Sequence, residues 1–321
     1  MLVVGMLPTE QGSFRLFRFA GIQVYLHWSW FIVALYEVNT RSREYSSPVW
    51  NLLEYMALFS IVLLHEFGHS LACRQVGGKA DQIVLWPLGG VAYVAPPQRP
   101  GATLWSIVAG PLVNVVLVPI LTVLCFVGVR LGWGESMPNL LEFLFTIRNI
   151  NFVLLVFNLL PVYPLDGGQI LRSLLWFPLG RARSLTIAAV IGIIGAVGLV
   201  ALALLLRSFW IGLMAAFMLM NCWRGLKQAA MLGRIARLPR RMGFACPACG
   251  EAPLRGPVWR CNSCHQAVDA FEACGTCPHC GGTFPSATCI DCGSESSLAQ
   301  WGCFSPPPGV PVPPPLTRSE R

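Results

Sequence analysis

The residues best suited to chemistry are two histidines four positions apart, His65 and His69, with Glu66 directly after the first. Residues at i and i+4 lie on one face of a helix, so both imidazoles can point a ring nitrogen at one metal ion. Glu66 lies beside that face, within reach of a proton on a water held by such a metal. A five-residue pattern of this kind also occurs by chance in ordinary helices, so its surroundings decide its meaning.

Those surroundings are apolar. Of the 321 residues, 55% are hydrophobic and only 12% are charged, which excludes an ordinary soluble globular protein and indicates a multi-spanning membrane protein. The net charge of +8 comes mostly from basic residues that flank apolar segments, which orients a chain in the bilayer and gives no strong nucleic-acid signal.

A distant carboxylate, Asp166, lies in another apolar stretch. An unpaired carboxylate in hydrocarbon costs about 2.5–3.5 kcal/mol, and binding a cation would relieve that cost. Two histidines and one carboxylate form a zinc ligand set that leaves the fourth position open for water. We therefore expect a catalytic zinc held by His65, His69 and Asp166. The alternative is that Asp166 is the N-cap of a helix starting at Gly167.

The expected fold is an all-α polytopic membrane protein with about six transmembrane helices and a re-entrant β-hairpin. The expected spans are about Ile22–Val38, Val49–Gln75, Thr103–Val129, Leu140–Phe177, Leu185–Leu206 and Phe209–Trp223. The fourth segment is too long for one span and is broken between Asn158 and Gly168. Only Arg207 and Ser208 separate the last two, which requires a tight turn.

Residues 82–95 differ from the spans because two short β-prone segments flank Pro87, Gly89 and Gly90. Such a hairpin must be buried in protein or line a wet cavity, since lipid cannot satisfy its edges; the alternative is a plain loop. Asn114 in the third span either accompanies close helix packing or faces the site as a hydrogen-bond donor. His27, beside tryptophans, favours an interfacial position over catalysis.

Beyond Arg241 the composition changes, and ten of the 13 cysteines lie from Cys246 to Cys303. Their spacing predicts two structural zinc sites, one of Cys246, Cys249, Cys261 and Cys264, the other of Cys277, Cys280, Cys289 and Cys292. Cys274 leaves the register of the second site open, and a disulfide framework is the alternative in an oxidising compartment. The expected domains are residues 1–241, a membrane-embedded domain; 242–304, a double zinc ribbon; and 305–321, a proline-rich disordered tail.

The chain resembles the site-2 protease family of intramembrane zinc metalloproteases over roughly residues 20–225. Four motifs carry the resemblance in the family's order: His65 to His69, Pro87 to Gly90, Ala109 to Pro111 with Asn114, and Asn158 to Gly168. The resemblance implies His65, His69 and Asp166 as zinc ligands and Glu66 as catalytic base. It implies substrate positioning by the hairpin around Gly89 and Gly90, and it places Asn158 at the family's asparagine position. The cysteine-rich tail departs from the PDZ or CBS modules that such proteins often carry.

The expected function is therefore zinc-dependent hydrolysis of a peptide bond in or near a transmembrane segment of a membrane-protein substrate. The alternatives are a membrane zinc transporter with a cytoplasmic metal-sensing tail and a catalytically dead scaffold. We expect a multi-pass protein of the cell membrane with both termini cytoplasmic, because basic residues concentrate on that side. Expected partners are the lipid bilayer, the substrate and a cytoplasmic regulatory protein docked on the zinc ribbons.

Overall fold

The computed structural model describes residues 12–32, 45, 47–86, 89–272 and 275–302. The chain forms two compact units, Met1–Ala230 and Met231–Arg321, and each is described by itself. The expected boundary after Arg241 stays a prediction. Cys274, Cys303, the Pro87–Leu88 pair and the proline-rich end lie outside the described residues, as does most of the polar linker after the first expected span.

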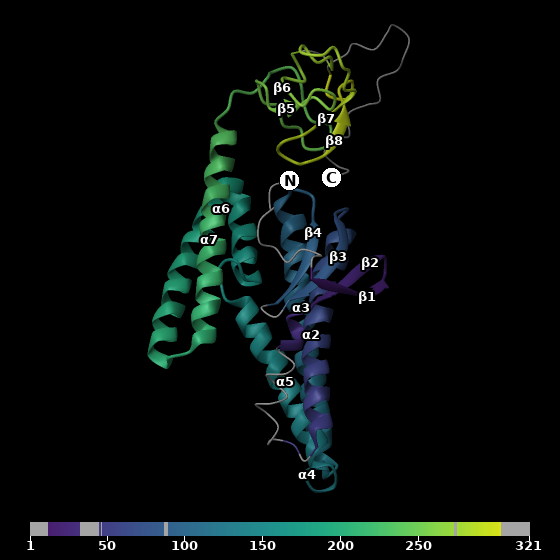
Figure 1. Ribbon diagram of the computed structural model, residues 1–321, viewed down its shortest axis with the longest axis vertical. Coiled ribbons are helices and arrows are strands. Elements are labelled where there is room, and N and C mark those ends of the chain that lie inside the picture. Colours follow the sequence, from purple (N-terminus) through teal and green to yellow (C-terminus); the bar gives the residue numbers. More distant parts are fainter. Residues whose placement is uncertain (1–11, 33–44, 46, 87–88, 273–274, 303–321) are drawn as a thin grey trace. The chain divides into compact units, whose positions relative to one another are not determined.

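The first unit contains a four-stranded sheet, built from strands that precede and follow helix α2 (Pro48–Gln75) (Figure 1). Its strands are β1 (Ser13–Phe19), β2 (Ile22–His27), β3 (Lys79–Trp86) and β4 (Gly89–Ala95), in the order β1-β2-β3-β4. The β1–β2 and β3–β4 pairs are antiparallel, and β2 runs parallel to β3. The expected antiparallel hairpin is therefore present, but it belongs to a larger sheet; its re-entrant position in a membrane stays a prediction.

The expected first span, from about Ile22 to Val38, is wrong at its start, because residues 22–27 form strand β2. Ile22 and Val24 are fully buried, whereas Gln23 and Tyr25 are only partly buried, which is the period-two burial of a strand. Ile22, Ile83 and Leu85 pack with Tyr55 and Phe67 of the helix that carries the histidines. The sheet is thereby fixed against that helix.

Five helices are long and apolar enough to cross a membrane among the described residues. They are α2 (Pro48–Gln75), α3 (Pro100–Arg130), α5 (Pro138–Leu159), α6 (Asp166–Leu206) and α7 (Phe209–Ala236); α4 (Trp133–Ser136) is a single turn. Together they cover the five expected segments after the first, although the bounds of α5 and α6 differ from the expected ones. The start of α2 is well specified, because the Ser47 side chain accepts from the Val49 N–H and Pro48 occupies the first turn.

The proline- and glycine-rich break predicted after Asn158 is confirmed: α5 ends at Leu159 and α6 begins at Asp166. The fourth expected segment therefore divides into α5 and the first part of α6. A second interruption lies inside α6 at Gly180, whose φ of 77° and ψ of 170° are not helical. The expected fifth span is the part of α6 after this kink, and the predicted tight turn at Arg207–Ser208 joins it to α7.

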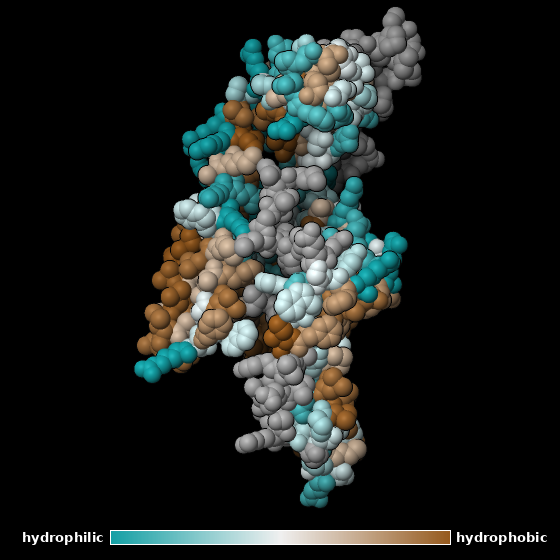
Figure 2. All heavy atoms as spheres, viewed as in Figure 1, coloured by the Kyte–Doolittle hydropathy of each residue, from teal (hydrophilic) through white to brown (hydrophobic). Residues whose placement is uncertain are grey.

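The helices present large apolar side chains outward. Figure 2 shows hydrophobic residues covering the α6–α7 hairpin, where Leu204, Leu205 and Phe209 are 75%, 81% and 77% exposed. Large contiguous apolar surfaces are rare on soluble monomers but are expected where lipid is the solvent. The first unit is thus a multi-pass membrane domain.

The second unit is small and contains two short hairpins. They are β5 (Trp259–Arg260) with β6 (Ala267–Val268), and β7 (Ser286–Thr288) with β8 (Glu295–Ser297). Its apolar core is limited to a few side chains, including Phe271, Leu298 and Trp301, packed among buried cysteines. A core of this size supplies little folding free energy, so bound metal is expected to supply much of it.

Candidate functional site

Both histidines of the apolar run point into the interior of the membrane unit. His65 and His69 lie one turn apart on α2 and are 6% and 8% exposed. Their Nε2 atoms are 3.1 Å apart, so they face one point, as the i, i+4 spacing predicts.

Asp166 reaches the same point from the first turn of α6. Its Oδ2 atom lies 3.0 Å from His65 Nε2 and 3.4 Å from His69 Nε2. The residue is the first of the helix, while Leu165 occupies the N-cap position and makes no capping hydrogen bond through its side chain. The alternative role of Asp166 as an N-cap is therefore wrong.

The three donor atoms fit a zinc ion. Nitrogen and oxygen ligands lie about 2.0–2.2 Å from zinc, so adjacent ligands of a tetrahedron are about 3.3–3.5 Å apart. The observed separations of 3.0, 3.1 and 3.4 Å are close to that range. The set is two imidazoles and one carboxylate, so one corner of a tetrahedron would remain for water or substrate.

The second nitrogen of each imidazole is also engaged. His65 Nδ1 lies 2.6 Å from Asn114 Oδ1, and His69 Nδ1 lies 2.9 Å from the Ser106 carbonyl oxygen. Because these oxygens only accept, each Nδ1 is the protonated nitrogen and each Nε2 keeps a free lone pair for metal. Of the two roles left open for Asn114, the site-facing one is observed, although it accepts from His65 through its oxygen.

Asn151 extends this chain of hydrogen bonds and was missed in the sequence. Asn114 Nδ2 donates to Asn151 Oδ1 at 2.8 Å, and Asn151 Nδ2 donates to the Asn114 carbonyl at 3.0 Å. Both asparagines are buried, at 1% and 0% exposure. Three helices, α2, α3 and α5, therefore share in fixing the orientation of His65. An isolated asparagine in an apolar run gives little signal that separates it from an ordinary packing amide.

Close packing of α2 on α3 requires glycine at two facing positions. A Cβ added to Gly110 would lie 2.2 Å from His69 Nε2, and one added to Gly68 would lie 2.6 Å from the Ala109 carbonyl oxygen. Real Cβ atoms do not approach that closely, so these glycines let α3 lie against the histidine face. This explains the glycines in two of the motifs.

Glu66 is buried beside the donors, at 6% exposure, and is not one of the three clustered donors. Its Oε2 accepts a hydrogen bond from the backbone N–H of Ala92 in β4 at 3.0 Å. The predicted hairpin and the predicted base are therefore in direct contact. A carboxylate has further lone pairs, so this bond leaves Glu66 able to accept a proton.

The remaining predicted residues lie at different places. Gly89 and Gly90 begin β4 opposite Trp86 and Leu85. Asn158 is half-buried near the end of α5. His27 lies at the end of β2, where its Nδ1 is 2.5 Å from Ser29 Oγ. The structure does not test a substrate role for Gly89, Gly90 or Asn158.

The second unit has four Cys-x-x-Cys pairs, here called knuckles, which begin at Cys246, Cys261, Cys277 and Cys289. Their eight cysteines form two groups of four, but the predicted grouping is wrong. One group contains Cys246, Cys249, Cys289 and Cys292, and the other contains Cys261, Cys264, Cys277 and Cys280. The first knuckle thus pairs with the last, and the second knuckle pairs with the third, so the two groups are nested in the sequence. The β5–β6 hairpin carries Cys261 and Cys264 in its loop, and the β7–β8 hairpin carries Cys289 and Cys292. The spacing of the cysteines does not reveal which other pair each loop meets.

Both groups have the dimensions of a zinc–thiolate site. In each group two pairs of sulfur atoms are 3.7 Å apart. Thiolates bound about 2.3 Å from a tetrahedral zinc are separated by about 3.7–3.8 Å, whereas a disulfide would bring two sulfurs to about 2.05 Å. The described cysteines are free thiols, so the disulfide alternative is wrong for them.

Thiolate repulsion explains why these groups need a cation. Backbone N–H groups of Cys264 and Ser263 lower the pKa of Cys261 to about 6. In the same group the Gly282 N–H lowers the pKa of Cys280, but the neighbouring thiols, with burial, outweigh it and raise that pKa to about 12. Four thiolates cannot share so small a volume unless a metal compensates their charge.

The segment before the first knuckle is built into the second unit. Arg240 donates two hydrogen bonds to Asp291, at 2.8 and 3.0 Å, and Asp291 lies inside the last knuckle. Arg241 donates to Asp269 at 2.7 Å, and the Arg241 N–H donates to the Pro253 carbonyl. Arg240 and Arg241 therefore belong to the fold of the second unit, which is called the ribbon unit from here on.

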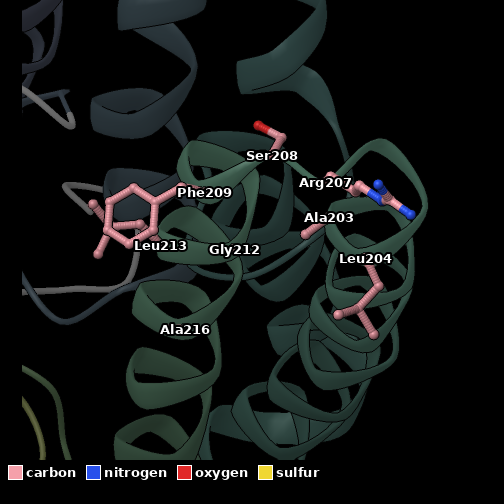
Figure 3. A pocket seen from close by; sticks show the side chains of 8 residues that line it. All are labelled: Ala203, Leu204, Arg207, Ser208, Phe209, Gly212, Leu213 and Ala216. Carbon is pink, nitrogen blue, oxygen red and sulfur yellow. The ribbon is translucent and has the colours of Figure 1, made fainter.

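A shallow hollow of about 620 Å³ lies at the turn between α6 and α7, and His65, His69 and Asp166 are not among its lining residues (Figure 3). Its lining is mostly apolar and includes Arg207, Ser208 and Phe209. No histidine, cysteine, aspartate or glutamate lines it, so it offers no comparable metal ligands.

Buried donors for a metal, carried by helices that can span a bilayer, define a multi-pass membrane metalloprotein. The sequence profile of peptidase family M50 matches residues 54–137 and 129–202, which include every residue of the three-donor site. A zinc metalloprotease of Methanocaldococcus jannaschii is 37% identical over 181 residues, which are 56% of this chain and 50% of that protein. Stage IV sporulation protein FB of Bacillus subtilis is 32% identical over 118 residues, 36% of this chain and 38% of that protein.

Among solved structures, the site-2 protease from Methanocaldococcus jannaschii matches with 31% sequence identity and a TM-score of 0.49. The match covers 67% of this chain and 95% of that one. The chain is therefore similar to peptidase family M50 over residues 54–202 and to a zinc metalloprotease over 56% of its length. It spans about half the length of the first curated relative that it matches.

Proposed function

We propose that the protein is a zinc-dependent endopeptidase that hydrolyses a peptide bond in or near a transmembrane segment of a membrane-protein substrate. The observation that carries the proposal is the meeting of His65, His69 and Asp166 within 3.4 Å of one another, with Glu66 buried beside them. Two histidines and a carboxylate form a hydrolytic zinc set, and a carboxylate next to it supplies the base. The match of residues 54–202 to the profile of a peptidase family supports the same chemistry.

The proposed holder of the catalytic zinc is the set His65, His69 and Asp166. Zinc in such a set supplies Lewis acidity, which polarises the scissile carbonyl and lowers the pKa of water towards about 7. Asn114 and the Ser106 carbonyl keep the imidazoles in the required tautomer and orientation. Glu66 takes the proton of the attacking water and passes it to the leaving amine.

An intact substrate helix hides its amides, so the scissile segment must unwind before it can react. Strand β4 is an edge of the sheet among the described strands, and it contacts the base. Addition of an extended substrate strand along β4 would hold that segment in the site by main-chain hydrogen bonds. The low side-chain bulk of Gly89 and Gly90 would leave room for it.

The test is Glu66→Gln, which keeps the size of the side chain and removes the base. We expect the variant to lose cleavage of a single-span membrane protein in proteoliposomes while it keeps the zinc content of the wild type. Glu142→Gln, an exposed glutamate of α5, is the matched control and should cleave normally. Normal cleavage by zinc-loaded Glu66→Gln would contradict the mechanism.

For the ribbon unit we propose two structural zinc ions, one in each cysteine group, and a role as a docking or regulatory module. The separations of the sulfur atoms support the zinc ions. In this proposal both termini are cytoplasmic, and the reducing compartment keeps the thiols available to metal. Zinc ribbons without a basic surface are suited to protein contacts, and few basic residues follow Arg241.

A further inference from the structure

The contact between Glu66 and β4 joins two parts of the proposed mechanism through one backbone group. Glu66 Oε2 accepts the N–H of Ala92 at 3.0 Å, and the glutamate is 6% exposed. Ala92 also packs against the cluster that contains Phe67, the residue after Glu66. The helix and the strand are therefore held together by this hydrogen bond and by apolar packing.

The direction of the Ala92 N–H follows from the register of the sheet. Ala92 lies opposite Ile83 in the antiparallel β3–β4 pair. In such a pair the hydrogen-bonding groups of alternate residues point toward the partner strand or away from it. Because the Ala92 N–H reaches Glu66 on α2, it points away from β3. Gly90, two residues earlier, presents its groups on the same outer side.

A substrate strand added to this edge would run about 4.8 Å from β4 and would use the same outward groups. In the structure, the Glu66 carboxylate accepts the outward-facing Ala92 N–H, and it therefore occupies the side of β4 where such a strand would pair. One N–H group serves one strong acceptor well, so strand addition and the Glu66–Ala92 hydrogen bond exclude each other.

We propose that the Ala92 N–H exchanges acceptors: it holds the Glu66 carboxylate against β4 in the free protein and passes to a substrate carbonyl when a strand pairs with β4. The proposal rests on the proposed function, because it takes Glu66 as the base and β4 as the substrate edge. Its consequence is that pairing of an extended chain releases the base. A chain that cannot pair with β4 leaves Glu66 on Ala92.

The exchange is tested by peptide binding to the full-length protein in detergent micelles, without turnover. The probe is a fluorescent heptapeptide of alternating valine and threonine, and the same peptide with central prolines is the non-pairing control. Glu66→Ala removes the competing acceptor and should tighten probe binding about tenfold, since a hydrogen bond to a charged group contributes at least that factor. Glu142→Ala is the matched control and should leave binding unchanged.

The decisive comparison repeats Glu66→Ala in an Ala92→Pro background. Proline is tolerated on a strand edge where the N–H faces outward, so Ala92→Pro deletes the shared donor and spares the β3–β4 ladder. We expect Glu66→Ala to have no effect on binding in that background. Equal tightening in both backgrounds, no tightening in either, or no pairing-dependent binding to any variant would overturn the proposal.

Hydrogen exchange gives a second measurement that needs no proline variant. In the protein without peptide, the segment Gly89–Ala95 should lose one slowly exchanging amide in Glu66→Ala, and an unchanged exchange pattern would contradict the hydrogen bond. Neither readout depends on peptide-bond cleavage. Failure of the exchange is therefore distinguishable from failure of the proposed protease activity, which the Glu66→Gln cleavage assay reports.

Discussion

Substitution of Gly110 by alanine should remove the zinc of the membrane unit. The new Cβ would lie 2.2 Å from His69 Nε2, the atom proposed to bind the metal. An ordinary contact needs about 3.4 Å or more, so ring and helix must separate by about 1 Å. Zinc–ligand distances tolerate about 0.2 Å, and loss of a mere supporting contact already costs about 10–100-fold in affinity. We therefore expect zinc affinity at this site to fall at least 100-fold.

The assay is chelator competition on the full-length protein, with zinc content measured by mass spectrometry. Gly101→Ala is the control on the same helix, because its added Cβ would meet only Phe177 Cζ at 3.9 Å. The zinc of the cysteine groups should be retained in both variants, which reports that the chain is folded. Wild-type zinc affinity and cleavage in Gly110→Ala would refute the close packing of α3 on His69.

Three further predictions follow from other contacts. Asn151→Leu removes both hydrogen bonds to Asn114 and should weaken zinc binding at the membrane site about 10–100-fold, whereas Asn149→Leu on the exposed face of α5 should not. Burial raises the pKa of Asp269, but N–H groups of Gly256, Phe271 and Glu272 and the Arg241 guanidinium outweigh it and hold the pKa below its usual value. A depressed folded-state pKa stabilises the ribbon unit above about pH 4, and this stabilisation is lost as the pH falls through the folded-state pKa. Asp269→Asn should therefore be less stable than wild type at pH 7. In thermal unfolding the two proteins should become equally stable at low pH. Deletion of residues 243–321 should change the rate or selectivity of cleavage but leave basal activity, and complete loss from a zinc-loaded membrane unit would exclude a purely regulatory tail.

The proposed ligands could be predicted because their chemistry is costly in apolar sequence. His65, His69 and Asp166 are polar groups in segments where an unpaired charge would destabilise insertion, so a shared metal was the economical explanation. The structure brings them together although 101 positions separate His65 from Asp166. The break between α5 and α6 was predictable for a similar reason, because prolines and glycines end helices.

Strand β2 could not be separated from a membrane span by hydrophobicity alone. Ile22, Val24 and Leu26 alternate with more polar residues, but the helix-length window that finds spans averages over that alternation. The strand exists because β1 and β3 pair with it on either side, which is non-local information. Tertiary pairing decided the structure here, and local composition did not.

The spacing of the cysteines in the sequence could not predict which of them share a site. The gap from Cys249 to Cys261 and the gap from Cys264 to Cys277 are similar in length, so each neighbouring pair of knuckles could have formed a site. The observed grouping joins Cys246 and Cys249 to Cys289 and Cys292, which depends on contacts between segments far apart in the sequence. Asn151 was not predictable for a different reason, because its role depends on which residue of α3 faces it.

Zinc stoichiometry tests the central claim most directly. The His65–His69–Asp166 site and the two cysteine groups predict three zinc ions in the full-length protein, one in the membrane unit and two in the ribbon unit. Asp166→Leu and His69→Phe should each bind two, with the ribbon zinc retained, and Cys264→Ser should lose a ribbon zinc but keep the membrane zinc. Three zinc ions retained in Asp166→Leu, with the chain folded, would contradict the assignment of the site.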